Sequence, residues 1–260
     1  MIQNSPDTNS SQEDFRVPGQ SSAVALELLS EALERRLTGG ELLTLFEEAS
    51  LHDLGRTAHA LRLRRSDPHI VTYVIDRNIT YTNVCHVDCR FCAFNRHQRD
   101  EEAFVLSGGE ILDKCRTVVE AGGSQILLQG GHHPRHRLSY YEEMLQSIRG
   151  AWPQIWIHGF SPSEILHFAR LNRLSAAEVL QRLKTAGLDS VPGGGAEILS
   201  DRVRRILAPG KASADEWIGV MEAAHALDLP TTVTMMFGHI ETHAERVEHC
   251  LLYTSDAADD

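Results

Sequence analysis

The sequence lacks any long apolar segment. No run approaches the roughly 20 apolar residues that a membrane-spanning helix needs, and residues 1–20 are polar, without the apolar core of a signal peptide. Positive charge is also scarce, since 25 Lys and Arg stand against 36 Asp and Glu, for a formal net charge of −11. This acidic balance argues against a general surface for nucleic acid or anionic membranes. We therefore expect neither a membrane nor a nucleic-acid partner.

Cysteine is scarce as well, but three of the five cysteines lie in one short segment. Cys85, Cys89 and Cys92 have the spacing C-x3-C-x2-C. Three thiolates this close can hold three irons of a cubane cluster and leave the fourth iron open, whereas a cluster ligated entirely by protein needs four cysteines. The odd number and the missing secretion signal exclude a disulfide framework, so we expect reduced thiols and a cytoplasmic location.

Two other interpretations of these cysteines remain open. A structural zinc ion could take them together with His86 or His97. Such sites usually supply a second ligand pair a dozen or more residues downstream, and no CxxC or HxxxH pair follows here. The thiols could also be inert and buried. Cys115 lies in an amphipathic helical pattern, and we expect it in the core rather than among the ligands.

Helical periodicity in residues 21–69 gives way to alternating strand and helix patterns from residue 70. Short β-rich segments that alternate with amphipathic helices predict parallel βα units. We expect strands at 71–79, 125–129, 155–160, 189–192 and 231–237, and helices at 107–121, 140–149, from 161, 175–186 and 215–226. The sequence thus predicts an α/β fold, a partial (β/α) barrel over residues 70–249 behind an N-terminal helical segment.

The two ends of the chain depart from this pattern. Residues 1–20 are predicted to be a disordered polar tail. Residues 250–260, CLLYTSDAADD, look like the translation of a sequencing-library adapter. We therefore expect a non-native tail and a barrel truncated at its C-terminus, without its sixth strand. A genuine acidic terminus is the alternative.

Glycine and polar side chains gather where the predicted strands end, and barrels of parallel strands carry their active sites at those carboxyl ends. QGGHHP at 129–134 follows the second strand, and the bare backbone of Gly130 and Gly131 would let a ligand approach. The segment SGGE at 107–110 begins a helix and follows no strand, so we do not expect it to bind a cofactor. The other candidate substrate-binding or catalytic residues are His132, His158, Ser161, Gly194, Glu197 and His239.

Several segments together resemble one enzyme family. TYTNVC before the first cysteine, CxFCAF, QGGHHP, HGFSPSEI, LDSVPGGGAEIL and TMMFGHIET occur in this order within residues 40–249. They are similar to the cyclic dehypoxanthinyl futalosine synthases, radical S-adenosylmethionine (SAM) enzymes of the futalosine route to menaquinone. The aminofutalosine synthases and the subunits of the deazaflavin F0 synthase are alternatives within the same group. A zinc-stabilised binding module is a remote alternative.

The resemblance implies a radical SAM oxidoreductase, a cyclase, with a 4Fe–4S cluster and SAM as cofactors. Cys85, Cys89 and Cys92 would bind the cluster, and Gly130 and Gly131 would contact SAM. A deoxyadenosyl radical would take a hydrogen from the ribose of the nucleoside substrate, dehypoxanthine futalosine, and the sugar radical would close a ring on its benzoate group. A reductant or electron-donor protein is the other implied partner.

The general base is not assigned by the resemblance. His158, Glu197 and His239 are the candidates for removing the proton that restores aromaticity. The radical chemistry implies a site that excludes water and stray hydrogen donors.

Overall fold

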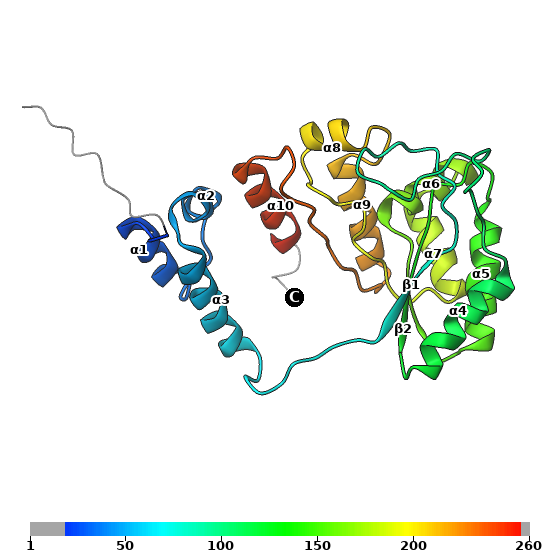
Figure 1. Ribbon diagram of the computed structural model, residues 1–260, viewed down its shortest axis with the longest axis horizontal. Helices are drawn as coiled ribbons and strands as arrows, with labels where there is room; N and C mark the ends of the chain where they lie inside the picture. The colour runs from blue at the N-terminus through cyan, green and yellow to red at the C-terminus, as the bar shows by residue number, and fades with distance from the viewer. Residues whose placement is uncertain (1–18, 256–260) are drawn as a thin grey trace, which may run out of the picture. The chain divides into compact units, whose positions relative to one another are not determined.

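The chain divides into two compact units, Met1–Val71 and Thr72–Asp260. The computed structural model describes residues 19–255 (Figure 1), so most of the predicted disordered tail and residues 256–260 lie outside the described part. No helix in that part is both long enough and apolar enough to cross a membrane.

The first unit consists of three helices, α1 (Ala23–Glu31), α2 (Gly39–Glu48) and α3 (Leu51–Arg65). Each begins after a Ser or Thr whose side chain accepts a hydrogen bond from a backbone N–H of the first turn, which satisfies a donor that the helix leaves unpaired. The helices enclose a small core of Ala25, Leu29, Leu37 and Leu45. The helical periodicity of this part of the sequence is thus confirmed.

The second unit is built on a parallel sheet whose strand order is β1-β2-β3. The strands are β1 (Asp76–Thr80), β2 (Gln125–Gln129) and β3 (Trp156–Gly159). Ile79 of β1 lies opposite Leu128 of β2, and both side chains are fully buried. Through these apolar positions the sheet forms part of the main core.

Helices follow the strands, and α4 (Gly108–Glu120) packs against β1 and β2. The others are α5 (Leu138–Ala151), α6 (Pro162–Asn172), α7 (Ala176–Ala186), α8 (Asp201–Leu207), α9 (Ala214–His225) and α10 (His243–Ser255). Helix α5 packs against α4 and α7, and α9 packs against α6 and α7 (Figure 1). At the centre of the core the rings of Tyr141 and Phe168 stack with their centroids 3.8 Å apart. The predicted α/β fold, a partial barrel of parallel βα units, is confirmed.

Three predicted strands differ from the structure. Residues 71–75 form no strand, because β1 pairs only with β2 and Asp76 already lies opposite the first residue of β2, Gln125. Tyr73 in this segment is 85% exposed. Residues 189–192 contribute isolated parallel bridges, from Ser190 to His158 and from Val191 to Thr231.

Residues 231–237 are likewise not a strand beyond the bridge at Thr231. Besides the backbone bond from the Thr232 N–H to the Val191 carbonyl (3.2 Å), threonine side chains supply hydrogen bonds here. The Thr232 hydroxyl accepts a hydrogen bond from the Gly193 N–H (3.0 Å), and the Thr234 hydroxyl donates one to the Gly193 carbonyl (2.9 Å). The glycine turn thus uses side-chain partners where the sequence pattern predicted a paired strand.

Helix α10 runs without a break across residue 250. Residues 250–255 of the segment that the sequence sets apart form its last part, and Leu252 packs against the main core. His249 of the same helix is fully buried, and its Nδ1 accepts a hydrogen bond from the Leu199 N–H (3.1 Å). This bond joins α10 to the segment before α8.

Candidate functional site

A cavity of about 300 Å³ lies at the carboxyl ends of β1 and β2. Parallel βα folds bind their ligands at this end of the sheet. The predicted site residues that line it are Cys85, Cys89, Cys92, Gly130, Gly131, His132, Ser161 and Gly194. The fold therefore brings the three cysteines together with the glycine segment after β2.

The loop that carries the cysteines, residues 81–106, is closed by its own hydrogen bonds. The Asn83 side chain donates to the Glu102 carbonyl (2.9 Å) and accepts from the Phe104 N–H (2.8 Å). The Cys85 N–H donates to the Arg96 carbonyl (3.0 Å). These contacts join the two ends of the loop, so the cysteines are presented on a closed turn rather than on an open strand end.

Burial disfavours the charged form of these thiols. It raises the pKa of Cys85, and it raises the pKa of Cys89 to about 11. Bound metal favours the thiolate, so a cluster would reverse this effect. Cys115 also has its pKa raised by burial, to about 11, but it lies in the core on α4, as predicted.

Two Gly-Gly pairs have opposite surroundings. A Cβ on Gly131 would meet the Val84 carbonyl oxygen at 2.3 Å, and one on Gly130 would meet the Tyr81 ring at 2.6 Å. A Cβ on Gly108 or Gly109 would meet no atom closer than 4.0 Å, and both residues are exposed. The pair after β2 thus lets two segments touch at the cavity, whereas the pair in SGGE only begins α4, with Glu110 in a capping box.

Glu164 lines the cavity and connects three segments: the start of the cysteine loop, the glycine segment after β2 and the first turn of α6. One carboxylate oxygen accepts hydrogen bonds from the Tyr81 hydroxyl (2.6 Å) and the Gly130 N–H (3.0 Å). The other accepts from the N–H (2.8 Å) and hydroxyl (2.7 Å) of Ser161. Burial raises the pKa of Glu164, while these four donors favour the ionised form. The carboxylate therefore fixes the glycine segment to the first turn of α6.

Lys211 is a half-buried cation in the cavity wall. Its Nζ lies 3.0 Å from Glu197 Oε1 and over the ring of Phe91, 5.4 Å from the centroid. Burial alone would lower the pKa of Lys211, but the Glu197 carboxylate outweighs it and the pKa is raised. Glu197 does not itself line the cavity. Glu197, predicted as a substrate contact or base, thus lies behind Lys211, which it keeps charged.

Arg204 holds the backbone beside this pair. The buried guanidinium donates to the carbonyls of Gly195 (2.9 Å), Ala196 (2.7 Å) and Ala212 (2.7 Å). Glu197 has positive φ (42°), a conformation that costs energy for a residue with a side chain. The three carbonyl contacts help to fix this turn.

His158 and His239 lie outside the cavity lining. His158 Nδ1 is 2.6 Å from the Ser190 hydroxyl, and burial lowers the pKa of this ring. His239 is exposed, and its ring contacts the Met236 carbonyl (2.8 Å) and the Glu241 carboxylate (2.9 Å). The His158 ring thus connects β3 to Ser190 and Thr232, whereas the His239 ring has partners within its own segment.

Comparison with known proteins shows the family. A model of the radical SAM superfamily matches residues 79–252. The chain is 46% identical over 217 residues to cyclic dehypoxanthine futalosine synthase of Streptomyces coelicolor, with 82% of this chain and 54% of that protein covered. It is 41% identical over 232 residues to 5-amino-6-(D-ribitylamino)uracil–L-tyrosine 4-hydroxyphenyl transferase 1 of Methanosarcina acetivorans, with 89% and 60% covered. This chain belongs to the radical SAM superfamily.

A solved structure agrees with this fold. Methylornithine synthase superimposes with a TM-score of 0.65 at 20% sequence identity, covering 89% of this chain and 64% of that one. In sequence the chain spans 54% and 60% of the length of the two relatives named above.

The superfamily uses a 4Fe–4S cluster and SAM, which are therefore the cofactors of this chain. The residues at the cavity fit them, because three thiols and a half-buried ammonium line one space. Among residues 19–255, the group of metal-binding side chains that converges closely enough for one ion is not these cysteines but His86, His132 and His167. Thiolates that each hold a different iron of a cluster need not converge on one point.

Proposed function

We propose that this chain is part of an enzyme that cyclises dehypoxanthine futalosine to cyclic dehypoxanthinyl futalosine. The observation that carries the proposal is the 46% identity over 217 residues to a cyclic dehypoxanthine futalosine synthase. The QGGHHP and DSVPGGGAEIL segments support it, because their residues resemble those of the cyclases more than those of the related enzymes.

Cys85, Cys89 and Cys92 would hold the cluster in this proposal, and the backbone of Gly130 and Gly131 would contact SAM. Together the two cofactors supply the 5′-deoxyadenosyl radical. Lys211 adds a half-buried positive charge in the same cavity wall, suited to a carboxylate of a bound ligand. An external reductant or electron-donor protein would complete the reaction.

The remaining cavity residues would shape the substrate site. Val87, Phe91 and Phe94 line the cavity with apolar surface, which helps to exclude water from a radical. Ser161 and Gly194 lie in the same lining and stay candidate substrate contacts.

A second function is favoured by a specific observation. The chain is 41% identical to the 4-hydroxyphenyl transferase over a longer span, 232 residues and 89% of its length. The transferase reaction, with tyrosine and 5-amino-6-(D-ribitylamino)uracil as the named reactants, is therefore the competing proposal. Aminofutalosine synthase is a third member of the group to be tested.

The test is a substrate comparison under anaerobic conditions. The chain alone, and the chain extended by the C-terminal part of the S. coelicolor relative, are each given SAM, a reductant and one substrate. We expect dehypoxanthine futalosine to yield a product lighter by two hydrogens, together with 5′-deoxyadenosine. Consumption of tyrosine with 5-amino-6-(D-ribitylamino)uracil, or of an enolpyruvyl benzoate, would instead establish one of the competing reactions.

A further inference from the structure

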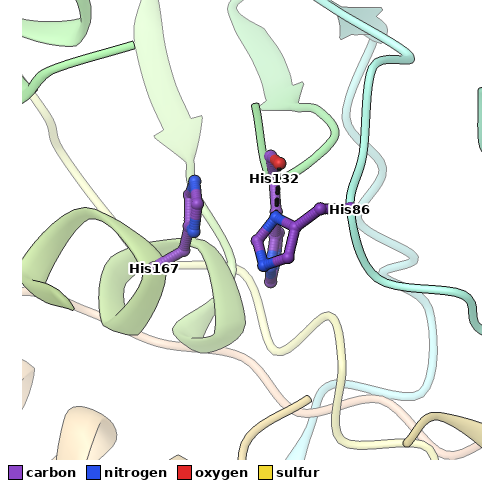
Figure 2. Close-up of side chains that lie close together, drawn as sticks. All are labelled: His86, His132 and His167. Carbon is purple, nitrogen blue, oxygen red and sulfur yellow. Dashed lines mark hydrogen bonds between the residues drawn. The ribbon is translucent and has the colours of Figure 1, made fainter. Parts of the chain in front are cut away.

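Three histidines from distant parts of the second unit converge beside the cavity. His86 lies in the cysteine loop, His132 follows β2, and His167 lies on α6 (Figure 2). One ligand nitrogen from each ring lies within 4.8 Å of the other two. The rings of His132 and His167 are stacked, with centroids 5.0 Å apart, and both residues are buried.

We propose that His86, His132 and His167 form a binding site for one divalent metal ion such as zinc, separate from the three cysteines. Imidazole nitrogen is a preferred ligand of zinc, and three protein ligands leave a fourth position for water or an anion. Tetrahedral zinc with bonds of about 2.0 Å separates its ligand nitrogens by roughly 3.3 Å. The rings therefore need to close by roughly 1.5 Å at most, which side-chain rotation can supply.

The hydrogen bonds around two of the rings already have the arrangement of a metal site. His86 Nδ1 lies 2.8 Å from the His132 carbonyl oxygen, and His167 Nε2 lies 2.9 Å from the His133 carbonyl oxygen. A carbonyl only accepts, so each of these nitrogens carries the proton and donates it. The opposite nitrogens, Nε2 of His86 and Nδ1 of His167, then hold free lone pairs. Histidines that bind metals commonly donate their second nitrogen to a carbonyl in this way.

The third ring is the one without such a partner. No hydrogen bond joins the His132 ring to any residue between 19 and 255, although this residue is only 7% exposed. A metal ion would give one of its nitrogens a partner. Lys211 and Arg170 place positive charge near His132. Their field disfavours a bare cation, so we expect a hydroxide or carboxylate as the fourth ligand.

The test uses the full chain with its iron–sulfur cluster loaded anaerobically, stripped of other metals and then given one equivalent of Zn²⁺. We expect one tightly held zinc per chain. X-ray absorption at the zinc edge should show nitrogen near 2.0 Å and no sulfur near 2.3 Å. A sulfur shell, or no retained zinc, would overturn the proposal.

Two variants and a control assign the ligands. His167→Gln keeps the buried volume, and His86→Ala changes an exposed side chain, so at least the second variant should fold. Each should weaken zinc binding by roughly a hundredfold or more while iron content stays unchanged, because one of three ligands is lost. His97→Ala, at an exposed histidine of the same loop, should bind zinc normally. Unchanged zinc affinity in His86→Ala would overturn the proposal. The site does not depend on the substrate, so failure of the cyclisation assay leaves this test intact.

Discussion

The three cysteines and the three histidines are two proposed sets of metal ligands that lie close together but arise differently. The cysteines lie within one loop, and their spacing is visible in eight consecutive residues, 85–92. The histidines come from a loop, a strand end and a helix, and only folding brings them together. Their comparison separates sites that are written locally in a sequence from sites that the tertiary structure assembles.

The largest expected effect tests the local set. Cys89→Ala should abolish binding of the 4Fe–4S cluster, because it removes one of the three proposed iron ligands. The measurement is iron and sulfide content after anaerobic reconstitution, with absorption near 400 nm. Cys115→Ala is the control, since that thiol is buried on α4. Equal iron loss in both variants would contradict the three-ligand assignment.

The next effect asks how far the local set depends on distant packing. Gly131→Ala should sharply reduce cluster occupancy, because its Cβ would lie 2.3 Å from the Val84 carbonyl and 3.0 Å from Cys85 Cβ. The cysteine loop would have to move. Gly109→Ala is the matched control in the other Gly-Gly pair, where space is open and alanine should stabilise α4 by about 0.5–1 kcal/mol. Full iron content in Gly131→Ala would show that the loop is independent of β2.

Glu164→Gln should lower the free energy of unfolding by about 1–3 kcal/mol. The amide has one acceptor oxygen where the carboxylate offers two, so the buried N–H of Gly130 or of Ser161 would face an NH2 group. Urea unfolding measures the change. Glu178→Gln is a matched control, because Glu178 closes the same kind of capping box with Ser175 at the surface. The stability loss in Glu178→Gln should be much smaller because solvent screens this exposed pair, and equal losses would show that burial of Glu164 is irrelevant.

The smallest effect concerns pH. Burial lowers the pKa of His249 from its usual 6.5. Between the lowered pKa of the folded chain and 6.5, the unfolded chain takes up a proton that the folded chain does not. Stability is therefore lost as pH falls below 6.5, by at most about 1.4 kcal/mol per pH unit for this group. His249→Asn keeps an acceptor for the Leu199 N–H and should flatten the dependence. Unfolding at several pH values checks it, and an identical slope in the variant would exclude His249.

Much of the fold could be predicted because its signals are local. Ser107, Ser161 and Ser175 all stand at helix N-caps as their spacing to a following Glu indicates, and Gly187 ends α7 with φ of 119°. The strand at 231–237 was wrong, since β-rich composition does not reveal whether a pairing partner is present.

The candidate site divides along the same line. The sequence identifies the cysteines and the glycines after β2, but not Lys211, Glu164 or His167. Glu164 gives a capping-box signal, yet nothing in that signal shows that the carboxylate is buried and also bound to Tyr81. Lys211 follows a Pro-Gly turn that is typical of a surface loop. Burial and contacts between distant segments decide the roles of these residues, and a single sequence does not contain that information.

The carboxylate of Glu164 also affects how the protein unfolds locally. The amide hydrogens of Gly130 and Ser161 are bound to the same side chain, one on each oxygen. Displacement of that side chain exposes both amides to solvent in one event, although they belong to different βα units. Exchange of both amides with deuterium should then depend on the same opening equilibrium, and we expect similar protection factors, so the end of β2 and the start of α6 form a single cooperative unit of local unfolding.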